Sequence, residues 1–452
     1  MKKNDMNRRQ FLQSAALAGA SLGIASGKEF LAASANTPSV SPNDRITVGM
    51  IGVGARAQQL LNEIQKIPSA EIVAVCDAYK GRVERAVERT GGRAKVSKRP
   101  EEIVADRGID VIVIATPDHL HRSQAIAAIK AGKDVYIEKP LTYRVDDGNE
   151  IAAALKGSGR IFQVGSQGIS SAIQQKAREI IKSGALGQIT MVRASYNRNT
   201  PGGAWIYPIP PDASPETVDW EMFLGPAPKR PFSPERFFRW RCFWDYSGGI
   251  ATDLFVHLMT TIHYIMDAKM ANKGAAMAAL YRWKETRDVP DTINAVLEYP
   301  EGFMVNLSGT FNNQMKEQGG FQILGTEGSL VIGGKTLTLI PENVVDDNNW
   351  IVESWPRRLE EQYYKDPKIK NVELPNTWDP KVQKGSEVWE EQGKDATLLH
   401  LENFFNSVRT RQEPVETALV GHRAAAVAHM VNESAKHNKT VLWDYKRETF
   451  KA

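Results

Sequence analysis

Two short segments contain side chains that could take part in proton transfer or charge stabilisation. The first is Glu138-Lys139-Pro140, which directly follows an apolar run over residues 134–137. Open parallel sheets bind their ligands beyond the carboxyl ends of their strands, so a lysine placed there could contact a substrate or a cofactor. A surface lysine behind a strand would produce the same pattern.

The second segment places an acid and an imidazole on one face of an apolar helix. Asp253 and His257 are four residues apart in a helix predicted over residues 250–266, so their side chains share a face. An acid beside a histidine can tune it as a base, whereas a hydrogen-bonded core histidine is the alternative. His263 points to a different face, and without a third ligand we expect no metal site.

A glycine motif near the start of the chain predicts a dinucleotide site. Gly52-x-Gly54-x-x-Ala57 lies between a predicted strand over residues 45–51 and a helical stretch. The first glycine permits a tight turn, the second lets the backbone approach a pyrophosphate, and the small third residue allows close packing of the helix. The helix N-terminus supplies amide donors for the phosphates.

An acidic residue stands where a ribose would be bound. Asp77 follows a second predicted strand and lies 20 positions after Ala57. Its carboxylate could accept hydrogen bonds from both ribose hydroxyls and would repel a 2′-phosphate, which favours NAD. Lys80 and Arg82 lie close by, so NADP stays possible.

The elements that must position these residues alternate between strand and helix. Apolar runs predict strands over residues 45–51, 71–76, 110–115, 134–137 and 161–164, with helical spacing between several of them. This alternation predicts an α/β Rossmann domain with a doubly wound parallel sheet over residues 36–165.

The pattern changes from residue 166 onward. Helical segments and alternating apolar runs predict an α+β domain over residues 166–452, with a large open, mostly antiparallel sheet and two C-terminal helices. The strands are expected over residues 189–195, 276–283, 292–298, 304–310, 321–324 and 329–332, and the closing helices over 396–410 and 418–436. Residues 341–393 are polar and predict a long surface excursion.

Residues 1–35 indicate an export signal rather than part of the fold. Arg8-Arg9 followed by Phe11-Leu12, a mildly apolar run and Ala33-Ser34-Ala35 resemble a twin-arginine signal peptide. We therefore expect handling by the twin-arginine export machinery and a periplasmic location, with an ordinary secretory signal as the alternative. The run is too short and weakly apolar for a stable membrane anchor.

The net charge and the cysteines bear on two further functions, nucleic-acid binding and zinc binding. The formal charge of the 452-residue chain is +4, and most of it lies within residues 1–35. The nearly neutral remainder offers no electrostatic reason to expect nucleic-acid binding. Cys76 and Cys242 are expected to be unpaired thiols, and no cysteine–histidine cluster suggests zinc.

Four features together resemble the glucose–fructose oxidoreductase / inositol dehydrogenase (Gfo/Idh/MocA) family, and their order and spacing cover nearly the whole chain after residue 35. They are the Gly-x-Gly fingerprint, Thr116-Pro117 followed by His121, Glu138-Lys139-Pro140, and the Gly-Gly-x-x-x-Asp-x-x-x-His segment from Gly248 to His257. The resemblance implies a Rossmann domain followed by a mixed domain whose open sheet supports the substrate site and homo-oligomer contacts.

The resemblance also implies that Lys139, Asp253 and His257 form the catalytic set. Oxidation of a secondary alcohol removes a hydride and a proton. A neutral His257 could take the proton, Lys139 could stabilise the developing alkoxide, and Asp253 could orient His257 or bind a sugar hydroxyl.

Binding residues are predicted for both ligands. Those expected at the cofactor are Gly52, Gly54, Ala55, Arg56, Asp77, Thr116, Pro117, His121, Glu138, Lys139 and Gln167. Those expected at the substrate are Arg198, Trp244, Tyr246, Asp253 and His257. Four of the ten tryptophans lie between residues 205 and 244, where they could stack on a sugar ring or only pack an irregular loop.

The sequence departs from the family pattern at two positions near the cofactor. Ala57 replaces the commoner glycine, and Asp118 stands where asparagine is expected after Thr116-Pro117. Asp118 places a potential charge near the cofactor.

These observations favour an exported NAD(P)-dependent oxidoreductase that acts on a secondary alcohol of a sugar or glycoside. Because free NAD is not expected to be plentiful outside the cytoplasm, we expect a tightly bound cofactor that cycles within the protein. A redox-neutral NAD-dependent glycoside hydrolase or lyase, acting through transient oxidation at C3, is the alternative. A non-catalytic sugar-binding protein is a third, which the retained Lys139, Asp253 and His257 argue against.

Overall fold

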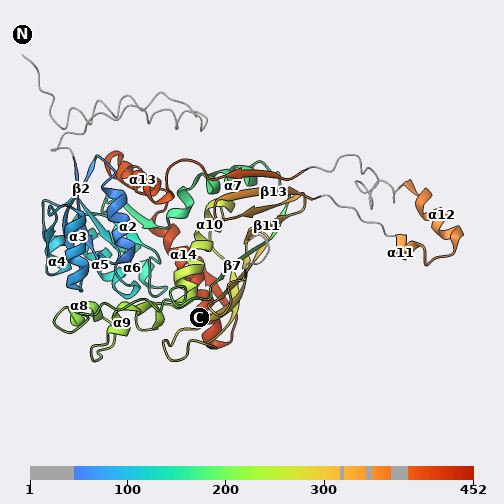
Figure 1. The fold of residues 1–452 in the computed structure, drawn as a ribbon. Coiled ribbons are helices and arrows are strands. Elements are labelled where there is room, and N and C mark those ends of the chain that lie inside the picture. Colours follow the sequence, from blue (N-terminus) through green and yellow to red (C-terminus); the bar gives the residue numbers. More distant parts are fainter. Residues whose placement is uncertain (1–44, 316–319, 343–348, 368–384, 452) are drawn as a thin grey trace, which may run out of the picture. The chain divides into compact units, whose positions relative to one another are not determined.

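Six short strands form a parallel sheet in the N-terminal part of the molecule (Figure 1). The computed structural model describes residues 45–315, 320–342, 349–367 and 385–451, and the strand order of this sheet is β3-β2-β1-β4-β5-β6. Its strands are β1 (Ile46–Ile51), β2 (Ala70–Cys76), β3 (Lys95–Val96), β4 (Val111–Ile114), β5 (Asp134–Glu138) and β6 (Phe162–Gly165). The central strands β4 and β5 are buried along their whole length, as expected of a sheet covered on both faces. The predicted doubly wound sheet is confirmed.

Helices cover this sheet in two layers. The helices α2 (Ala55–Ile64), α3 (Lys80–Arg89) and α13 (Ala396–Thr410) share one apolar core with the sheet. The helices α4 (Pro100–Ala105), α5 (Asp118–Lys130) and α6 (Asp147–Leu155) contribute to the core on the other face. The chain therefore has to pass from one face to the other at the β1/β4 boundary, where open α/β sheets form their ligand crevice.

The helix α13 is positioned differently from the sequence prediction, which assigned it to the second domain. Its apolar residues Leu401, Phe404 and Phe405 are fully buried in the core of the first sheet. Beyond its end, Arg411 pairs with Asp134 at the start of β5, with Nη1 2.6 Å from a carboxylate oxygen. Periodicity identified the helix, but the choice of sheet depended on long-range packing.

Ten strands form the second sheet, in the order β14-β13-β12-β11-β7-β10-β9-β8-β15-β16. Neighbouring strands are antiparallel except for β7 and β10, which are parallel. The strands are β7 (Ile189–Asn197), β8 (Lys273–Ala279), β9 (Thr292–Tyr299), β10 (Phe303–Thr310), β11 (Phe321–Gly325), β12 (Gly328–Ile332), β13 (Thr336–Pro341), β14 (Glu387–Glu390), β15 (Val441–Asp444) and β16 (Thr449–Phe450). The predicted open, mostly antiparallel sheet is confirmed, and β13 to β16 extend it beyond the strands predicted from the sequence.

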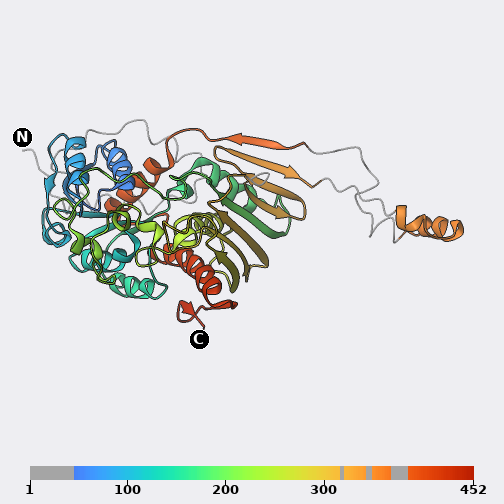
Figure 2. The ribbon, with the colours of Figure 1, turned by 60° about the horizontal axis from the view of Figure 1, so that its bottom comes forward.

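One face of the second sheet is covered by helices and the other is open (Figure 2). The helices α7 (Ala172–Lys182), α10 (Val256–Met266) and α14 (Ala418–His437) contribute to the core on the covered face. Burial alternates along β9 and β10, which is the pattern of strands with one solvated face. On the open face Met277 is 79% exposed.

The segment predicted as a surface excursion contains two short helices. These are α11 (Asn349–Val352) and α12 (Arg357–Lys365), and α12 has no buried residue. The flanking strands β13 and β14 pair with each other, so the excursion begins and ends at adjacent positions of the second sheet.

Three further predictions concern the N-terminal residues, the cysteines and membrane-spanning helices. Residues 1–35, with the predicted export signal, lie outside the described residues. Cys76 and Cys242 are both buried and unpaired, which confirms the prediction of free thiols. Within the described ranges, no helix combines the length and apolar character needed to cross a membrane.

The burial of α13 yields a stability prediction. Phe404→Ala should lower the free energy of unfolding by about 3–5 kcal/mol, because it removes a large side chain from a packed core and leaves a cavity. Leu419→Ala, at a position 46% exposed on α14, is the matched control and should change stability by less than about 1 kcal/mol. Denaturant unfolding followed by circular dichroism measures both. Equal stability of the two variants would contradict the placement of α13 in the first core.

Candidate active site

The glycine motif forms a tight turn between β1 and α2. Gly52 has φ +80°, and a Cβ there would lie 2.8 Å from the backbone carbon of Ala115, so a side chain is excluded. The helix α2 begins at Ala55 with Gly54 as its N-cap, and within the described part of the chain no side chain caps it. Its first amide groups are therefore available to a phosphate, and the turn fits a dinucleotide.

Asp77 is held at the edge of this turn. Its Oδ2 accepts a hydrogen bond from the Val53 amide at 2.8 Å, and its Oδ1 accepts one from the Tyr79 amide at 2.9 Å. Two basic residues lie nearby. Lys80 Nζ donates a hydrogen bond to the Glu216 carbonyl oxygen at 2.6 Å. Arg82 lies 3.6 Å from Asp77 and lines the ligand cavity.

A cavity of about 540 Å³ extends from the glycine turn to the second sheet. Ten of the eleven predicted cofactor residues line it. They are Gly52, Gly54, Ala55, Arg56, Asp77, Thr116, Pro117, Glu138, Lys139 and Gln167.

His121 is the exception among the predicted cofactor residues. It is buried, with Nδ1 2.8 Å from the Pro140 carbonyl oxygen and Nε2 2.9 Å from that of Thr116. This placement corrects the expectation of a cofactor contact. His121 instead connects two loops that line the cavity, because its ring reaches both of their backbones.

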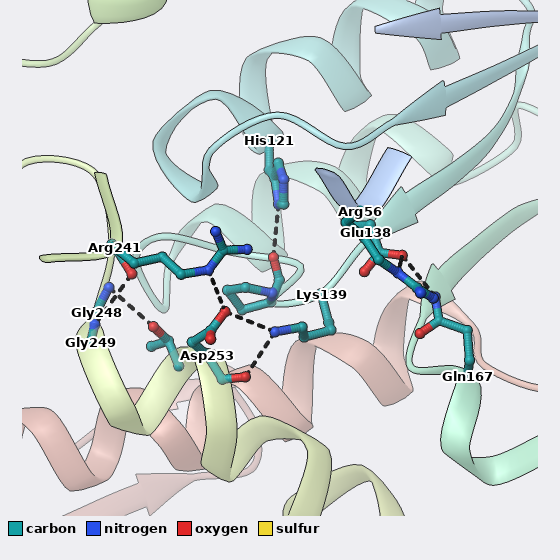
Figure 3. A network of polar contacts seen from close by, with 12 residues as sticks. Arg56, His121, Glu138, Lys139, Gln167, Arg241, Gly248, Gly249 and Asp253 are labelled. Atoms are coloured by element: carbon teal, nitrogen blue, oxygen red, sulfur yellow. Dashed lines mark hydrogen bonds and ion pairs between the residues drawn. The ribbon is translucent and has the colours of Figure 1, made fainter. Parts of the chain in front are cut away.

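A polar cluster organises the end of β5. Glu138 Oε1 accepts hydrogen bonds from Arg56 Nε at 3.0 Å and from Gln167 Nε2 at 2.7 Å (Figure 3). Gln167 opens the short 3-10 helix η3 (Gln167–Ser170), which follows β6. The cluster joins α2, β5 and η3 and thereby orients the adjacent Lys139.

Lys139 and Arg241 converge on one carboxylate (Figure 3). Lys139 Nζ lies 2.9 Å from Asp253 Oδ1 and 2.8 Å from the Asp253 carbonyl oxygen. Arg241 Nε donates to the same Oδ1 at 3.0 Å. Arg241 lies in the 3-10 helix η4 (Trp240–Cys242), a position that the sequence prediction missed.

Asp253 lies in a π-helical turn, η5 (Ala251–Phe255), which continues into α10. The sequence predicted a regular helix over this region. The turn follows Gly248-Gly249, and the Gly248 amide donates to Thr252 Oγ1 at 3.0 Å. Single π turns inside helices often occur at functional sites, because the wider turn re-aims a side chain.

The two cations determine the charge of Asp253. Burial alone would raise the pKa of this carboxyl, but the positive charges of Lys139 and Arg241 outweigh burial and hold its pKa well below the usual range. Asp253 is therefore ionised at neutral pH.

His257 lies one turn after Asp253 and lines the same cavity. Burial lowers the pKa of His257 to about 3, and the nearby charge of Lys139 acts in the same direction. The imidazole is therefore neutral at neutral pH and can accept a proton.

Asp118 is a second carboxyl in the cavity and the first residue of α5. It is 2% exposed, and among the described residues its Oδ2 has no hydrogen-bond partner. Burial raises the pKa of Asp118 to about 7, and the negative charge of Asp253 adds to this effect. The departure from asparagine therefore places a titrating group in the site.

The structure separates the predicted substrate residues into two groups. Arg198, Asp253 and His257 line the cavity. Trp244 lies outside it, in a separate groove, and Tyr246 is fully buried between His119 and Phe223. These placements correct the expectation that Trp244 and Tyr246 contact the substrate.

Other aromatic residues line the cavity instead. They are Tyr196, Trp205, Tyr207, Phe223, Phe237, Phe238 and Trp240. The high density of aromatic residues between 205 and 244 indicated a binding region, but it did not determine which rings line the cavity. Among the described residues no group of three or more side chains could hold a metal ion.

The arrangement combines the requirements of alcohol oxidation in one cavity. A dinucleotide turn lies at one end, and an ammonium group, a neutral imidazole and an ionised carboxylate lie together beyond it. The lysine can stabilise an oxyanion and the imidazole can accept a proton.

Comparison with known proteins agrees with the fold. A family model described as "Oxidoreductase family, NAD-binding Rossmann fold" (Gfo/Idh/MocA) matches residues 46–166, and a model of the Gfo/Idh/MocA C-terminal domain matches residues 223–331. Together they match about half of the chain. The chain therefore belongs to the Gfo/Idh/MocA family and is an NAD-dependent oxidoreductase of this type.

The chain is similar to proteins named as a sugar reductase and an inositol dehydrogenase. The chain is 25% identical to 1,5-anhydro-D-fructose reductase of Ensifer adhaerens, over 67% of this chain and 79% of the relative. It is also 25% identical to an NAD-dependent scyllo-inositol 2-dehydrogenase of Bacillus subtilis, over 60% and 69% of the two chains. A solved levoglucosan dehydrogenase, in complex with NADH and levoglucosan, has the same fold, with a TM-score of 0.65, 18% identity, and coverage of 88% of this chain and 99% of that chain.

The environment of Asp118 yields a pH-dependent stability prediction. Its pKa rises from an ordinary 3.8 to about 7 on folding, so burying the carboxylate costs stability above pH 7, and this cost disappears as the pH falls towards 4. Asp118→Asn, which cannot ionise, should raise the free energy of unfolding at pH 8 by roughly a few kcal/mol and should gain little at pH 4.

Denaturant unfolding at several pH values measures this difference. The control is Glu285→Gln, at an exposed carboxyl outside the cavity. A gain at Asp118 that is the same at pH 4 and pH 8 would show that the carboxyl is not held protonated by its surroundings.

Proposed function

We propose that this protein oxidises a secondary hydroxyl of a sugar or glycoside ring by transferring a hydride to NAD. The observation that carries the proposal is the convergence of Lys139, Asp253 and His257 in the cavity that begins at the dinucleotide turn. Two family relatives are named for an anhydro sugar and for an inositol. These names support a polyhydroxylated ring as the substrate.

The proposed chemistry assigns one role to each of these residues. NAD, when bound, supplies the hydride acceptor. The neutral His257 accepts the proton of the reacting hydroxyl, and the ammonium group of Lys139 stabilises the negative charge that develops on its oxygen. The Asp253 carboxylate orients Lys139 through the 2.9 Å contact and favours the positive charge that His257 gains.

We further propose that the protein works in the periplasm after export by the twin-arginine machinery, as a homo-oligomer with NAD tightly bound. Arg8-Arg9 and the mildly apolar run after them support this route. The route is associated with proteins that are exported already folded, so NAD could be loaded before export. The open face of the second sheet, with Met277, Val296 and Met304 exposed, supports contacts between copies.

Lys139→Met is the direct test of the chemistry. It should lower kcat by about 10²- to 10⁴-fold, because the variant loses the cation that stabilises the alkoxide, while NAD stays bound. Asp253 keeps its contact with Arg241, so the fold should survive. The assay is NADH formation, measured across a panel of neutral and acidic monosaccharides.

The matched control is Lys130→Met, at an exposed lysine of α5 outside the cavity, which should behave as wild type. If Lys139→Met turns over as fast as wild type, the proposed role of Lys139 is wrong. Release of aglycone from nitrophenyl glycosides without net NADH would indicate redox-neutral glycoside cleavage instead.

Export and cofactor retention are tested in one experiment. The full chain, expressed in a bacterium with a twin-arginine pathway, should appear in the periplasmic fraction with about one NAD(H) per chain, measured by mass spectrometry after denaturation. Arg8→Lys/Arg9→Lys should hold the protein in the cytoplasm, because the paired arginines are the recognition feature.

Unchanged export of the double lysine variant would contradict the twin-arginine route. Periplasmic protein that contains no nucleotide would contradict tight binding. Neither result would affect the proposed chemistry, which the Lys139→Met variant tests separately.

A further inference from the structure

The substrate end of the cavity contains more positive than negative charge. Lys139 and Arg241 both contact the single carboxylate of Asp253. A third cation, Arg198, lines the same cavity, and among the described residues it has no carboxylate within ion-pair distance. Its guanidinium Nη1 donates to the Gly203 carbonyl oxygen at 3.3 Å.

The terminal nitrogens of Arg241 are available to a ligand. Its Nε is used by Asp253, and its guanidinium carbon lies 4.2 Å from the centre of the Trp240 ring. Figure 3 shows the two terminal nitrogens directed away from Asp253. Within the described part of the chain these nitrogens have no protein partner.

The two arginines act on a common region of the cavity. Burial raises the pKa of the Tyr207 phenol, and the charges of Arg241 and Arg198 both oppose this increase. Tyr207 itself lines the cavity, so Arg198 and Arg241 present their charges to the same ligand space.

The other carboxyls in the cavity do not neutralise this charge. Glu138 is occupied by Arg56 and Gln167 at the end of β5, and Asp77 belongs to the dinucleotide turn beside Arg82. Asp118 is the remaining acid, and because burial raises its pKa to about 7 it is only partly ionised at neutral pH. A neutral sugar would leave the half-buried Arg198 without a counter-charge.

The dinucleotide does not account for these arginines either. Its pyrophosphate fits the glycine turn and the N-terminus of α2, in the first part of the chain. Arg198 follows β7 and Arg241 lies in η4, so both belong to the part of the cavity lining that the second sheet and its loops provide.

We propose that the substrate carries a carboxylate that binds Arg198 and the terminal nitrogens of Arg241, so that the substrate class is a sugar acid such as a uronate. Guanidinium groups match a planar carboxylate and can donate two parallel hydrogen bonds to it. The inference rests on the proposed function, because it names the substrate class of that same site.

The test compares sugar acids with the neutral sugars of the same configuration. The full chain loaded with NAD is titrated calorimetrically with D-glucuronate, D-glucose, D-galacturonate and D-galactose, and NADH formation is measured with each. At least one acid should bind at least 10-fold more tightly than its neutral counterpart. Arg198→Gln should reduce this preference by about 10- to 100-fold, since it removes a charged donor from the carboxylate.

Arg193→Gln is the matched control, because Arg193 is an exposed residue of the same strand region in β7 and does not line the cavity. It should keep the full preference for the acid. Arg198→Glu should go further and reverse the preference, so that D-glucosamine binds more tightly than D-glucuronate.

The outcomes separate this inference from the proposed function. If neutral sugars bind as tightly as acids or are the better substrates, the carboxylate inference is overturned and the proposed oxidation of sugars stands. The same inference is overturned if Arg198→Gln keeps the wild-type preference. If no member of the panel binds or reduces NAD, both the inference and the proposed function fail.

Discussion

The arrangement of the active site depends on the carboxylate of Asp253, which Lys139 and Arg241 share. A buried carboxylate without partners is strongly disfavoured, and a buried ion pair is costly to break once one partner is removed. The two contacts, at 2.9 and 3.0 Å, connect the end of β5, the π turn before α10 and the 3-10 helix η4. The loop after β5 is thereby held against two neighbouring segments that lie about 100 residues later in the sequence.

This shared charge determines the protonation states around it. Asp253 stays ionised because two cations surround it, whereas burial and the negative charge of Asp253 raise the pKa of the neighbouring Asp118 to about 7. Burial and the Lys139 charge keep His257 neutral. The pKa values of two carboxyls of similar chemistry therefore differ widely within one cavity, which is a common way in which a protein separates acid from base.

Both the N-terminal and the C-terminal parts of the chain contribute residues to this site. The first sheet provides the glycine turn and Lys139, and the loops and helices of the second part provide Asp253, His257, Arg198 and Arg241. The C-terminal helices connect the two parts, since α13 packs in the first core and α14 contributes to the core of the second sheet. The described residues from Ile46 onward consequently form one compact unit, although the chain contains two sheets.

Local patterns in the sequence were sufficient for most of the longer strands and helices and for the dinucleotide end of the site. Continuous apolar runs identify the buried parallel strands, because such strands are covered on both faces, and the glycine spacing predicts the turn at Gly52, where the backbone of Ala115 leaves no room for a side chain. Short strands such as β15 and β16 contain too few residues to show the two-residue alternation of apolar and polar side chains. The π turn at Asp253 was missed because it preserves the apolar pattern of a regular helix.

What the sequence by itself determined is the chemistry that is locally encoded: the Rossmann sheet, the cofactor turn, and the identities of Lys139, Asp253 and His257. Only the tertiary structure decided that Arg241 completes the Asp253 ion pairs, that Tyr246 and Trp244 lie outside the cavity, and that His121 connects two loops. The physical reason is that spacing along the chain fixes which residues share a helix face or a strand end. The direction of a side chain in an irregular loop depends instead on contacts with distant segments, and these form only when the whole chain packs.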